Sequence, residues 1–274
     1  VCSVVNIILD LLLILVIPLG VLGAAIATLI AQAVSAVLVT VTLMYRTEGM
    51  KLCLSQIRMY KRMLQSILKI GLPAGFEAIM YSISNIIVQV SINNFGVDTM
   101  AAWTAYSKID FIFWMINSAF GISVMTFVGQ NYGAGKWDRI RRGTKICLGM
   151  ALISAVSVSI ILMSAERFLF GIFVNDVGVV EIGIRMMNVI APAYLLFAFI
   201  EVFSGALRAQ GAVVVSTLIT MVGICVLRMI WVTLVAAHGT LEQVIICYPI
   251  TWAAGALAMS IYYIYKQRKI FQAR

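Results

Sequence analysis

Residues 21–44 read VLGAAIATLIAQAVSAVLVTVTLM, a run of 24 residues without a charged side chain. A helix that crosses the hydrocarbon core of a bilayer needs about 20 consecutive, mostly apolar residues. Because water does not reach that core, a spanning segment must satisfy its backbone hydrogen bonds internally, as a helix does. The stretch therefore predicts a transmembrane α-helix and guides the interpretation of the remaining sequence.

Seven further apolar stretches qualify, or nearly qualify, as spanning helices. They lie at residues 1–17, 70–92, 99–128, 144–163, 184–207, 212–236 and 244–265. Of all 274 residues, 62% are hydrophobic and 11% are charged. A soluble domain carries about 25% charged residues. We therefore predict an all-α integral membrane protein with about eight transmembrane helices.

The 20 Lys and Arg residues are distributed unevenly between the two sides of these helices. Sixteen fall on one side: Arg46, Lys51, Arg58, Lys61, Arg62, Lys69, Lys136, Arg139, Arg141, Arg142, Lys145, Arg208, Lys266, Arg268, Lys269 and Arg274. Only Arg167 and Arg185 fall on the other. Because cytoplasmic loops carry the excess of Lys and Arg, we expect residues 45–69, residues 129–143 and the C-terminus to be cytoplasmic and His238 to face outside. The net charge of +9 then reflects orientation in the membrane, and nucleic-acid binding is not expected.

Three sections follow from this pattern: residues 1–44 with two helices, a linker at 45–69, and residues 70–274 with six helices. Apolar side chains in the linker recur at three- and four-residue spacing, at Ile57, Tyr60, Leu64 and Ile67. This spacing predicts an amphipathic helix that lies in the membrane interface. The chain begins Val1-Cys2-Ser3, without Met or the basic segment of a signal peptide, so we expect it to start inside a helix of a longer protein.

Six ionisable side chains fall inside the predicted spans, where charge is costly and usually functional. They are the carboxylates of Asp10, Glu77, Asp110 and Glu201 and the cations of Lys108 and Arg228. Glu77 and Glu201 each lie about 10 Å from the cytoplasmic side, and could share a cation or a proton. Asp110 and Arg228 lie about 13–18 Å from the outer side, and could form a pair with Lys108 nearby. Alternatively, all six are structural pairs or line polar, hydrated spots.

Other chemistry finds little support in the sequence. The five cysteines are scattered without a CxxC pair, and no Ser/His/Asp or metal-spaced cluster is present, so neither an enzyme nor a metal site is expected. The glycine-rich segment 129–136 lacks the phosphate-loop pattern, because Gln130 and Trp137 replace its Gly and its Ser or Thr. Four interior acids against two bases instead favour a cationic cargo or coupling ion.

Several motifs together resemble the multidrug and toxic compound extrusion (MATE) family. They are GLPAG at 71–75, NNFG at 93–96, VGQNYGAGK at 128–136 and SGALRAQG at 204–211, with NIILD at 6–10 and GAAIAT at 23–28 upstream. The resemblance implies twelve helices in two six-helix lobes, of which this chain would hold helices 5 to 12. Its expected partners are small cationic organic substrates, membrane lipids and the four missing N-terminal helices. It also implies export driven by Na⁺ or H⁺, without a cofactor, from the cell membrane.

The resemblance also indicates where cations would bind. One branch of the family uses a Glu eight residues after the Pro of GLPAG and an Asp eleven residues before the Arg of SGALRAQG. These positions are Tyr81 and Phe197 here, whereas Glu77 and Glu201 each lie one turn closer to the cytoplasm. We therefore expect Glu77, Glu201, Asp110 and Tyr81 to contact cation or substrate. Lys108, Arg228 and Asp10 are expected to be structural or relay charges.

Two alternatives to a multidrug or cation antiporter remain at this point. A flippase for lipid-linked oligosaccharides would share the fold, but such a protein tends to line its cavity with basic residues, and this interior is acidic. A membrane scaffold without transport activity would have little use for charges buried on several helices.

Overall fold

The computed structural model describes residues 2–45, 52–53, 55, 57–235 and 239–272. Every regular element in these residues is a helix, which confirms the predicted all-α class. The chain forms two compact units, Val1–Leu64 and Gln65–Arg274. His238 and, within the expected linker, residues 46–51, 54 and 56 lie outside the described residues.

The first unit is a pair of apolar helices. Helix α1 (Cys2–Leu11) continues into a π-helical segment, η1 (Leu12–Val16), and α2 (Gly20–Tyr45) follows after a short turn. The 26 residues of α2 extend about 39 Å, which is enough to cross a bilayer. Residues Cys2–Val16 form a shorter apolar helix.

Helix α3 (Lys61–Asn93) differs from two expectations for this region. The predicted interfacial helix around 57–67 is not a separate element, because residues 57–60 have no regular structure and α3 runs unbroken past Lys69. Pro73 was expected near the start of a helix, but it lies inside α3. The residues before it, KRMLQSILK at 61–69, are mostly strong helix formers, which offset the hydrogen bond that a proline removes.

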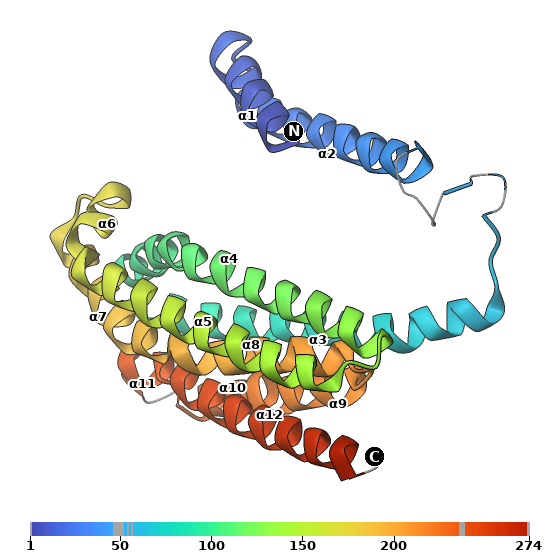
Figure 1. Cartoon of the computed structure of the whole chain (residues 1–274). Coiled ribbons are helices and arrows are strands. Elements are labelled where there is room, and N and C mark those ends of the chain that lie inside the picture. Colours follow the sequence, from blue (N-terminus) through green and yellow to red (C-terminus); the bar gives the residue numbers. More distant parts are fainter. Residues whose placement is uncertain (1, 46–51, 54, 56, 236–238, 273–274) are drawn as a thin grey trace. The chain divides into compact units, whose positions relative to one another are not determined.

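The second unit continues with a bundle of long and short helices. They are α4 (Val97–Gly133), α5 (Trp137–Ser164), α6 (Glu166–Phe173), α7 (Val177–Ile190), η3 (Ala191–Ala193), α8 (Tyr194–Ala209), α9 (Val213–Thr220), η4 (Met221–Val226), α10 (Leu227–Val235), α11 (Leu241–Ile245) and α12 (Cys247–Gln272). Within this unit, α6 and α11 lie at one end of the bundle and the C-terminus lies at the other (Figure 1). Helix α8 packs against α4, α5 and α12 and is the centre of the bundle.

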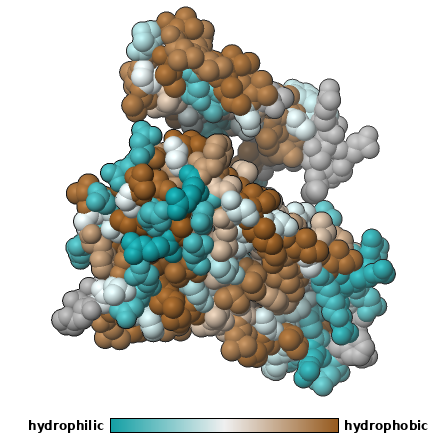
Figure 2. All heavy atoms as spheres, turned by 90° about the vertical axis from the view of Figure 1, so that its left-hand side faces the viewer, coloured by the Kyte–Doolittle hydropathy of each residue, from teal (hydrophilic) through white to brown (hydrophobic). Residues whose placement is uncertain are grey.

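Seven helices of the described residues are long and apolar enough to cross a membrane. The eighth predicted span is the shorter segment Cys2–Val16, so the prediction of about eight helices agrees with the structure. Large apolar side chains are exposed on the outside of these helices, with exposed fractions of 90% for Val21 and 70% for Ile153. Apolar residues cover most of the face in Figure 2, and hydrophilic residues gather in patches. Such a surface suits lipid as the surrounding solvent.

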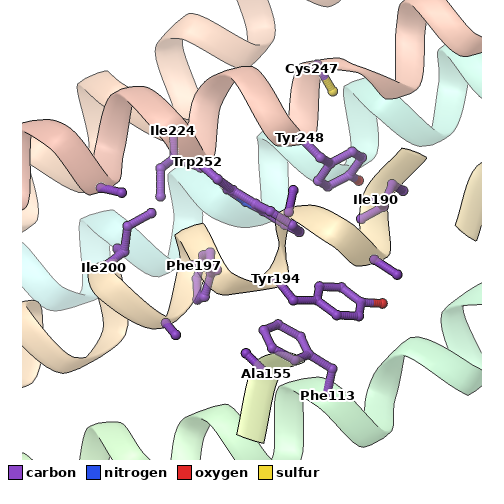
Figure 3. Close-up of a cluster of buried hydrophobic side chains, with 14 of the residues drawn as sticks. Phe113, Ala155, Ile190, Tyr194, Phe197, Ile200, Ile224, Cys247, Tyr248 and Trp252 are labelled. Carbon is purple, nitrogen blue, oxygen red and sulfur yellow. The ribbon is translucent and has the colours of Figure 1, made fainter. Parts of the chain in front are cut away.

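The core around α8 is rich in aromatic rings. Pro192 lies in η3, a single 3-10 turn that separates α7 from α8 and places Tyr194 at the first position of α8. The Tyr194 ring stacks on Phe113 of α4 at 3.9 Å between ring centroids. Trp252 of α12 is 1% exposed and packs edge-on against Phe197 (Figure 3). This packing fixes the helices that carry the interior charges.

Candidate functional site

A cavity of about 320 Å³ in the second unit brings together residues from α3, α4, α8 and α9. Its lining consists of Glu77, Tyr81, Gly121, Ile122, Met125, Phe197, Ile200, Glu201, Ser204, Gly205, Arg208 and Thr220. Both predicted carboxylates, Glu77 and Glu201, are therefore on the same cavity. Tyr81 and Phe197, which occupy the positions indicated by the family pattern, line it as well.

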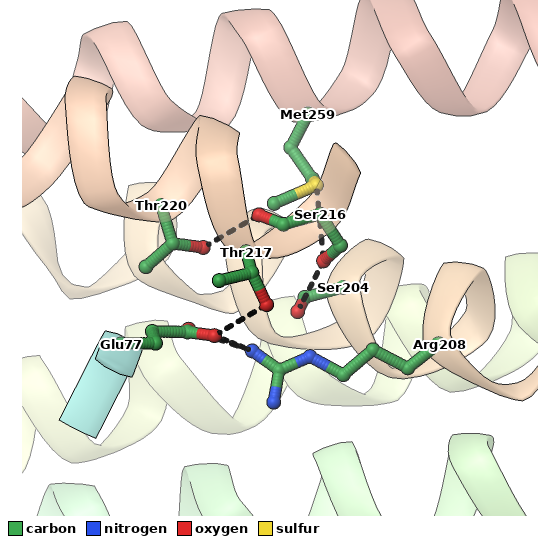
Figure 4. A network of polar contacts seen from close by, with 7 residues as sticks. All are labelled: Glu77, Ser204, Arg208, Ser216, Thr217, Thr220 and Met259. Carbon is green, nitrogen blue, oxygen red and sulfur yellow. Dashed lines mark hydrogen bonds and ion pairs between the residues drawn. The ribbon is translucent and has the colours of Figure 1, made fainter. Parts of the chain in front are cut away.

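The carboxylate of Glu77 is neutralised by a cation from α8. Arg208 Nη2 lies 2.6 Å from Glu77 Oε1 and 2.8 Å from Glu77 Oε2, and the Thr217 hydroxyl donates to Oε2 at 3.0 Å (Figure 4). The Glu77 side chain is only 13% exposed. A carboxylate at this depth needs such partners, because a buried charge without them is strongly destabilising.

Further hydroxyl groups extend this arrangement toward α12. The Ser204 and Ser216 hydroxyls are 2.9 Å apart, and Ser216 also donates to the Met259 sulfur at 3.9 Å. The Thr220 hydroxyl donates a hydrogen bond to the Ser216 backbone carbonyl, at 3.1 Å. The polar contacts thus connect α8, α9 and α12 behind the Glu77–Arg208 pair (Figure 4).

Glu201 has a different environment from Glu77. Within the described residues, neither a hydrogen bond nor an ion pair reaches its carboxylate, although it lies on the central helix α8. The carboxylate packs directly against Gly121 of α4, where any Cβ atom would collide with it. It is half-buried and lines the cavity, so it differs from Glu77 in having no hydrogen-bonded cation among the described residues.

The expected pairing of Glu77 with Glu201 needs a correction. The sequence indicated that the two carboxylates could share a cation or a proton, but Glu77 already has Arg208 as its counter-ion. Arg208 itself was interpreted from the sequence as part of the orientation signal on a cytoplasmic loop. It lies instead in the last turn of α8, and its side chain is 30% exposed. Spacing alone gave no indication of this contact, because Glu77 and Arg208 are 131 residues apart.

The expected pair of Asp110 and Arg228 is also corrected by the structure. Asp110 accepts hydrogen bonds from the indole of Trp114, at 2.6 Å, and from the Tyr194 hydroxyl. Tyr106 lies 3.1 Å from Tyr194, hydroxyl to hydroxyl, and extends this cluster. In the part of the chain that the structure describes, no ion pair joins Asp110 to Arg228. The four-residue spacing of Asp110 and Trp114 was the one sequence signal for this arrangement.

Arg228 is completely buried and is surrounded by neutral groups. Its Nη1 donates to the Asn85 side chain at 3.1 Å, and its guanidinium lies over the rings of Tyr248 and Tyr81, at 4.3 and 5.7 Å from their centroids. Attraction between a cation and an aromatic ring compensates part of its lost hydration. Arg228 therefore connects α10 to Tyr81 of α3 and to Tyr248 of α12.

The remaining two candidates lie elsewhere. Lys108 is exposed and lines a separate cavity of about 500 Å³ together with Gln89 and Trp103. Asp10 belongs to the first unit, where its Oδ1 and the amide nitrogen of Asn6, one turn earlier, are both buried and have no hydrogen-bond partner among the described residues. The structure therefore gathers Glu77, Glu201 and Tyr81 at one cavity and leaves Asp110, Lys108 and Asp10 outside its lining.

Comparisons with known proteins agree with this architecture. Residues 73–234 match the family model described as MatE. The probable multidrug resistance protein YoeA of Bacillus subtilis is 26% identical over 260 residues, covering 92% of this chain and 56% of that protein. The multidrug export protein MepA of Staphylococcus saprophyticus is 25% identical over 247 residues, covering 85% of this chain and 54% of that protein. The chain thus spans little more than half the length of these relatives.

Solved structures show the same fold. The crystal structure of MATE in complex with MaL6 matches with a TM-score of 0.89 at 18% identity, covering 99% of this chain and 62% of that one. At this level of identity, the similarity establishes the arrangement of the helices.

Proposed function

The chain belongs to the MatE family, a family of multi-pass membrane transporters, and from that membership we propose that it serves in a secondary active antiporter. Its cargo is proposed to be cationic, lipophilic compounds, and its driving reaction the inward flow of Na⁺ or H⁺. The names of YoeA and MepA, a multidrug resistance protein and a multidrug export protein, support this direction of transport. No catalytic step and no cofactor besides the coupling ion are proposed.

One observation carries the proposal: the carboxylate of Glu201, on a membrane-spanning helix, lines a cavity and forms neither an ion pair nor a hydrogen bond with any of the described residues. A charged group within the bilayer is costly, and it persists where it serves an ion or substrate pathway. A cation that enters the cavity compensates this cost directly. Protonation of Glu201 compensates it as well, so that cargo and coupling ion compete for one carboxylate.

The rest of the lining suits a lipophilic cation. Tyr81 and Phe197 offer aromatic surface, and Ile200, Ile122 and Met125 offer apolar surface. Aromatic faces attract organic cations by about 0.5–2 kcal/mol each. A small number of polar groups in a mostly apolar cavity is also the usual composition of a small-molecule site.

The pair of Glu77 and Arg208 gives a physical reason for coupling between the bound cation and the conformation. A cation at Glu201 shares the cavity with the Arg208 guanidinium, and the two positive charges repel each other. This repulsion favours a conformation in which Arg208 and the cation are further apart. A ligand shifts a conformational equilibrium only through such differential contacts.

The test is dye efflux from energised membrane vesicles that contain the full-length protein, with an imposed Na⁺ gradient in one series and an imposed pH gradient in another. We expect Glu201→Gln to reduce efflux at least about tenfold, because the cation loses its carboxylate partner. Asp98→Asn is the matched control, since Asp98 is an exposed carboxylate in the first turn of α4, outside the cavity lining. Efflux at the normal rate in Glu201→Gln vesicles, at equal protein amounts, would refute the proposal and leave a scaffold role.

The same vesicles separate the proposal from a lipid-linked oligosaccharide flippase. Efflux of a cationic dye that depends on an ion gradient supports the antiporter. Flipping of a fluorescent polyprenyl-linked sugar without such a gradient, together with no dye efflux, would replace it.

A further inference from the structure

Another cavity, of about 400 Å³, lies between the first turns of α5 and the last turns of α12. Three cations line it, Arg141, Lys145 and Arg268, against the single carboxylate of Asp138. Among the described residues, none of the three cations takes part in an ion pair. The cavity therefore offers concentrated positive charge to an anion. Its lining shares no residue with the transport site proposed above.

The cavity is held in place by contacts from α12 to the centre of the bundle. Lys266 Nζ donates to the Gln210 carbonyl at 2.9 Å, and the Gln267 amide donates to the Gln210 side chain at 3.0 Å. One turn earlier in α12, the Tyr263 ring stacks on Phe203 of α8, with 4.5 Å between the ring centroids. These contacts hold the end of α12 that carries Arg268.

Tyr263 forms part of the cavity wall without offering its hydroxyl to a ligand. Its side chain is 7% exposed, and its hydroxyl oxygen has almost no accessible surface. The donors that the cavity presents are therefore the three charged side chains of Arg141, Lys145 and Arg268.

The position of the cavity indicates the source of the anion. Both α5 and α12 are membrane-spanning candidates, and the cavity lies at their ends, with Trp137 in its lining. Tryptophan and tyrosine are enriched at the level of lipid headgroups. From the cavity, an exposed apolar stripe follows α12 toward the middle of the span through Ile264, Ile261 and Leu257. A soluble anion would make no use of this stripe, whereas an acyl chain would cover it.

We propose that this cavity binds the phosphodiester headgroup of an anionic phospholipid, with one acyl chain along the α12 stripe. Arginine suits this ligand because its planar guanidinium can donate two parallel hydrogen bonds to a phosphate. Basic pockets between helices at a membrane surface are suited to anionic headgroups. A zwitterionic headgroup is disfavoured, since its own cation would approach three others.

The test is native mass spectrometry of the full chain, purified in a neutral detergent and titrated with phosphatidylglycerol or phosphatidylcholine. The cavity variant combines Arg141→Gln, Lys145→Gln and Arg268→Gln. The matched control combines Arg139→Gln, Arg142→Gln and Lys269→Gln, which removes the same charge from exposed positions on the same two helices, outside the cavity lining. We expect the cavity variant to bind phosphatidylglycerol at least about tenfold more weakly than the control, because it loses three charged donors.

Two further measurements keep the outcomes separate. Tyr263→Phe should leave phosphatidylglycerol binding unchanged, because the Tyr263 hydroxyl has almost no accessible surface, and phosphatidylcholine binding should be the same in all variants. Should the triple cavity variant fail to fold, Arg268→Gln alone takes its place. Equal phosphatidylglycerol affinity in the cavity and control variants would overturn the proposal. Displacement of the lipid by millimolar inorganic phosphate would also overturn it, in favour of a soluble anion.

Discussion

Glu77, Asp110 and Glu201 lie away from the ends of membrane-spanning helices in the second unit, and their immediate partners give them different properties. Glu77 has a guanidinium and a hydroxyl, Asp110 has an indole and a phenol, and Glu201 has neither kind of partner among the described residues. Removing one partner of a buried ion pair is costly, because the other charge stays buried. Hydrogen bonds from neutral donors, as at Asp110, do not neutralise the charge of a carboxylate. The local partners therefore distinguish Glu77, which belongs to an ion pair, from Glu201, which is proposed to bind a cation.

The Glu77–Arg208 pair leads to a first prediction. Arg208→Gln leaves the Glu77 carboxylate without its counter-ion, and should lower the free energy of unfolding by about 3 kcal/mol. The double variant Arg208→Gln with Glu77→Gln removes both charges and should recover most of that loss. Unfolding in mixed detergent micelles, followed by circular dichroism, measures both. A double variant no more stable than Arg208→Gln would show that the pair is not coupled.

The Asp110 cluster leads to a second prediction. Asp110→Asn and Tyr194→Phe disrupt the same hydrogen bond, so a double-mutant cycle should give a coupling free energy of about 1 kcal/mol. Asp110→Asn and Arg228→Gln disrupt different contacts, and their effects on stability should add to within about 0.5 kcal/mol. If instead Arg228→Gln rescued Asp110→Asn, the two residues would act as an ion pair after all.

At the scale of the elements, the site depends on how closely α4 and α8 approach each other. A Cβ atom on Gly205 of α8 would lie 2.8 Å from the Gly121 carbonyl oxygen of α4 and 2.9 Å from the Val124 side chain. Backbone atoms cannot move aside as the end of a flexible side chain does. The two glycines therefore permit the contact that holds Glu201, on α8, against α4.

This helix contact leads to a third prediction. Gly205→Ala should force α4 and α8 apart and destabilise the protein by about 1–3 kcal/mol, with a loss of dye efflux because the cavity changes shape. Gly149→Ala on α5 is the control, since nothing lies within 4 Å of its Cβ position. The control should be neutral or stabilise the protein by about 0.5–1 kcal/mol, as alanine is the better helix former. Thermal unfolding in detergent distinguishes the two variants, and equal melting temperatures would contradict the prediction.

At the scale of the whole molecule, the two ends of the second unit differ in their basic residues. Among the described residues, the Lys and Arg side chains at the α6 and α11 end are paired with carboxylates, Arg167 with Glu181 at 2.7 Å and Arg185 with Glu242 at 3.3 Å. The turn after α4, the start of α5 and the end of α12 instead carry the basic residues counted in the sequence. The uneven number of Lys and Arg residues at the two ends is the asymmetry from which the orientation is predicted.

A fourth prediction tests this orientation. In a chain without its native cysteines, Arg139→Cys in the first turn of α5 should resist a membrane-impermeant maleimide in intact cells. Val177→Cys at the start of α7, at the other end of the bundle, should react. Both positions are exposed, so accessibility within the protein does not limit labelling. Labelling of Arg139→Cys but not Val177→Cys in intact cells would reverse the proposed cytoplasmic position of the C-terminus.

The sequence by itself determined the helical class, the approximate positions of the spans and the family. These follow from local properties, since a run such as residues 21–44 has only one way to satisfy its backbone in lipid. The ends of the helices were harder to predict from the sequence. The residues before Pro73 are helical, for example, so that α3 begins at Lys61. The 3-10 turn at Pro192 likewise moved the start of α8 to Tyr194.

Only the tertiary structure decided which charges meet. The depth of Glu77 and Glu201 followed from counting residues along each helix, and it correctly indicated that they could share a cavity. Counting residues along a helix does not show how that helix is rotated about its axis relative to its neighbours. This rotation brings Arg208 next to Glu77 and places Asp110 and Arg228 in separate clusters. Depth depends on helical rise, a local quantity, whereas pairing depends on packing between segments more than 80 residues apart.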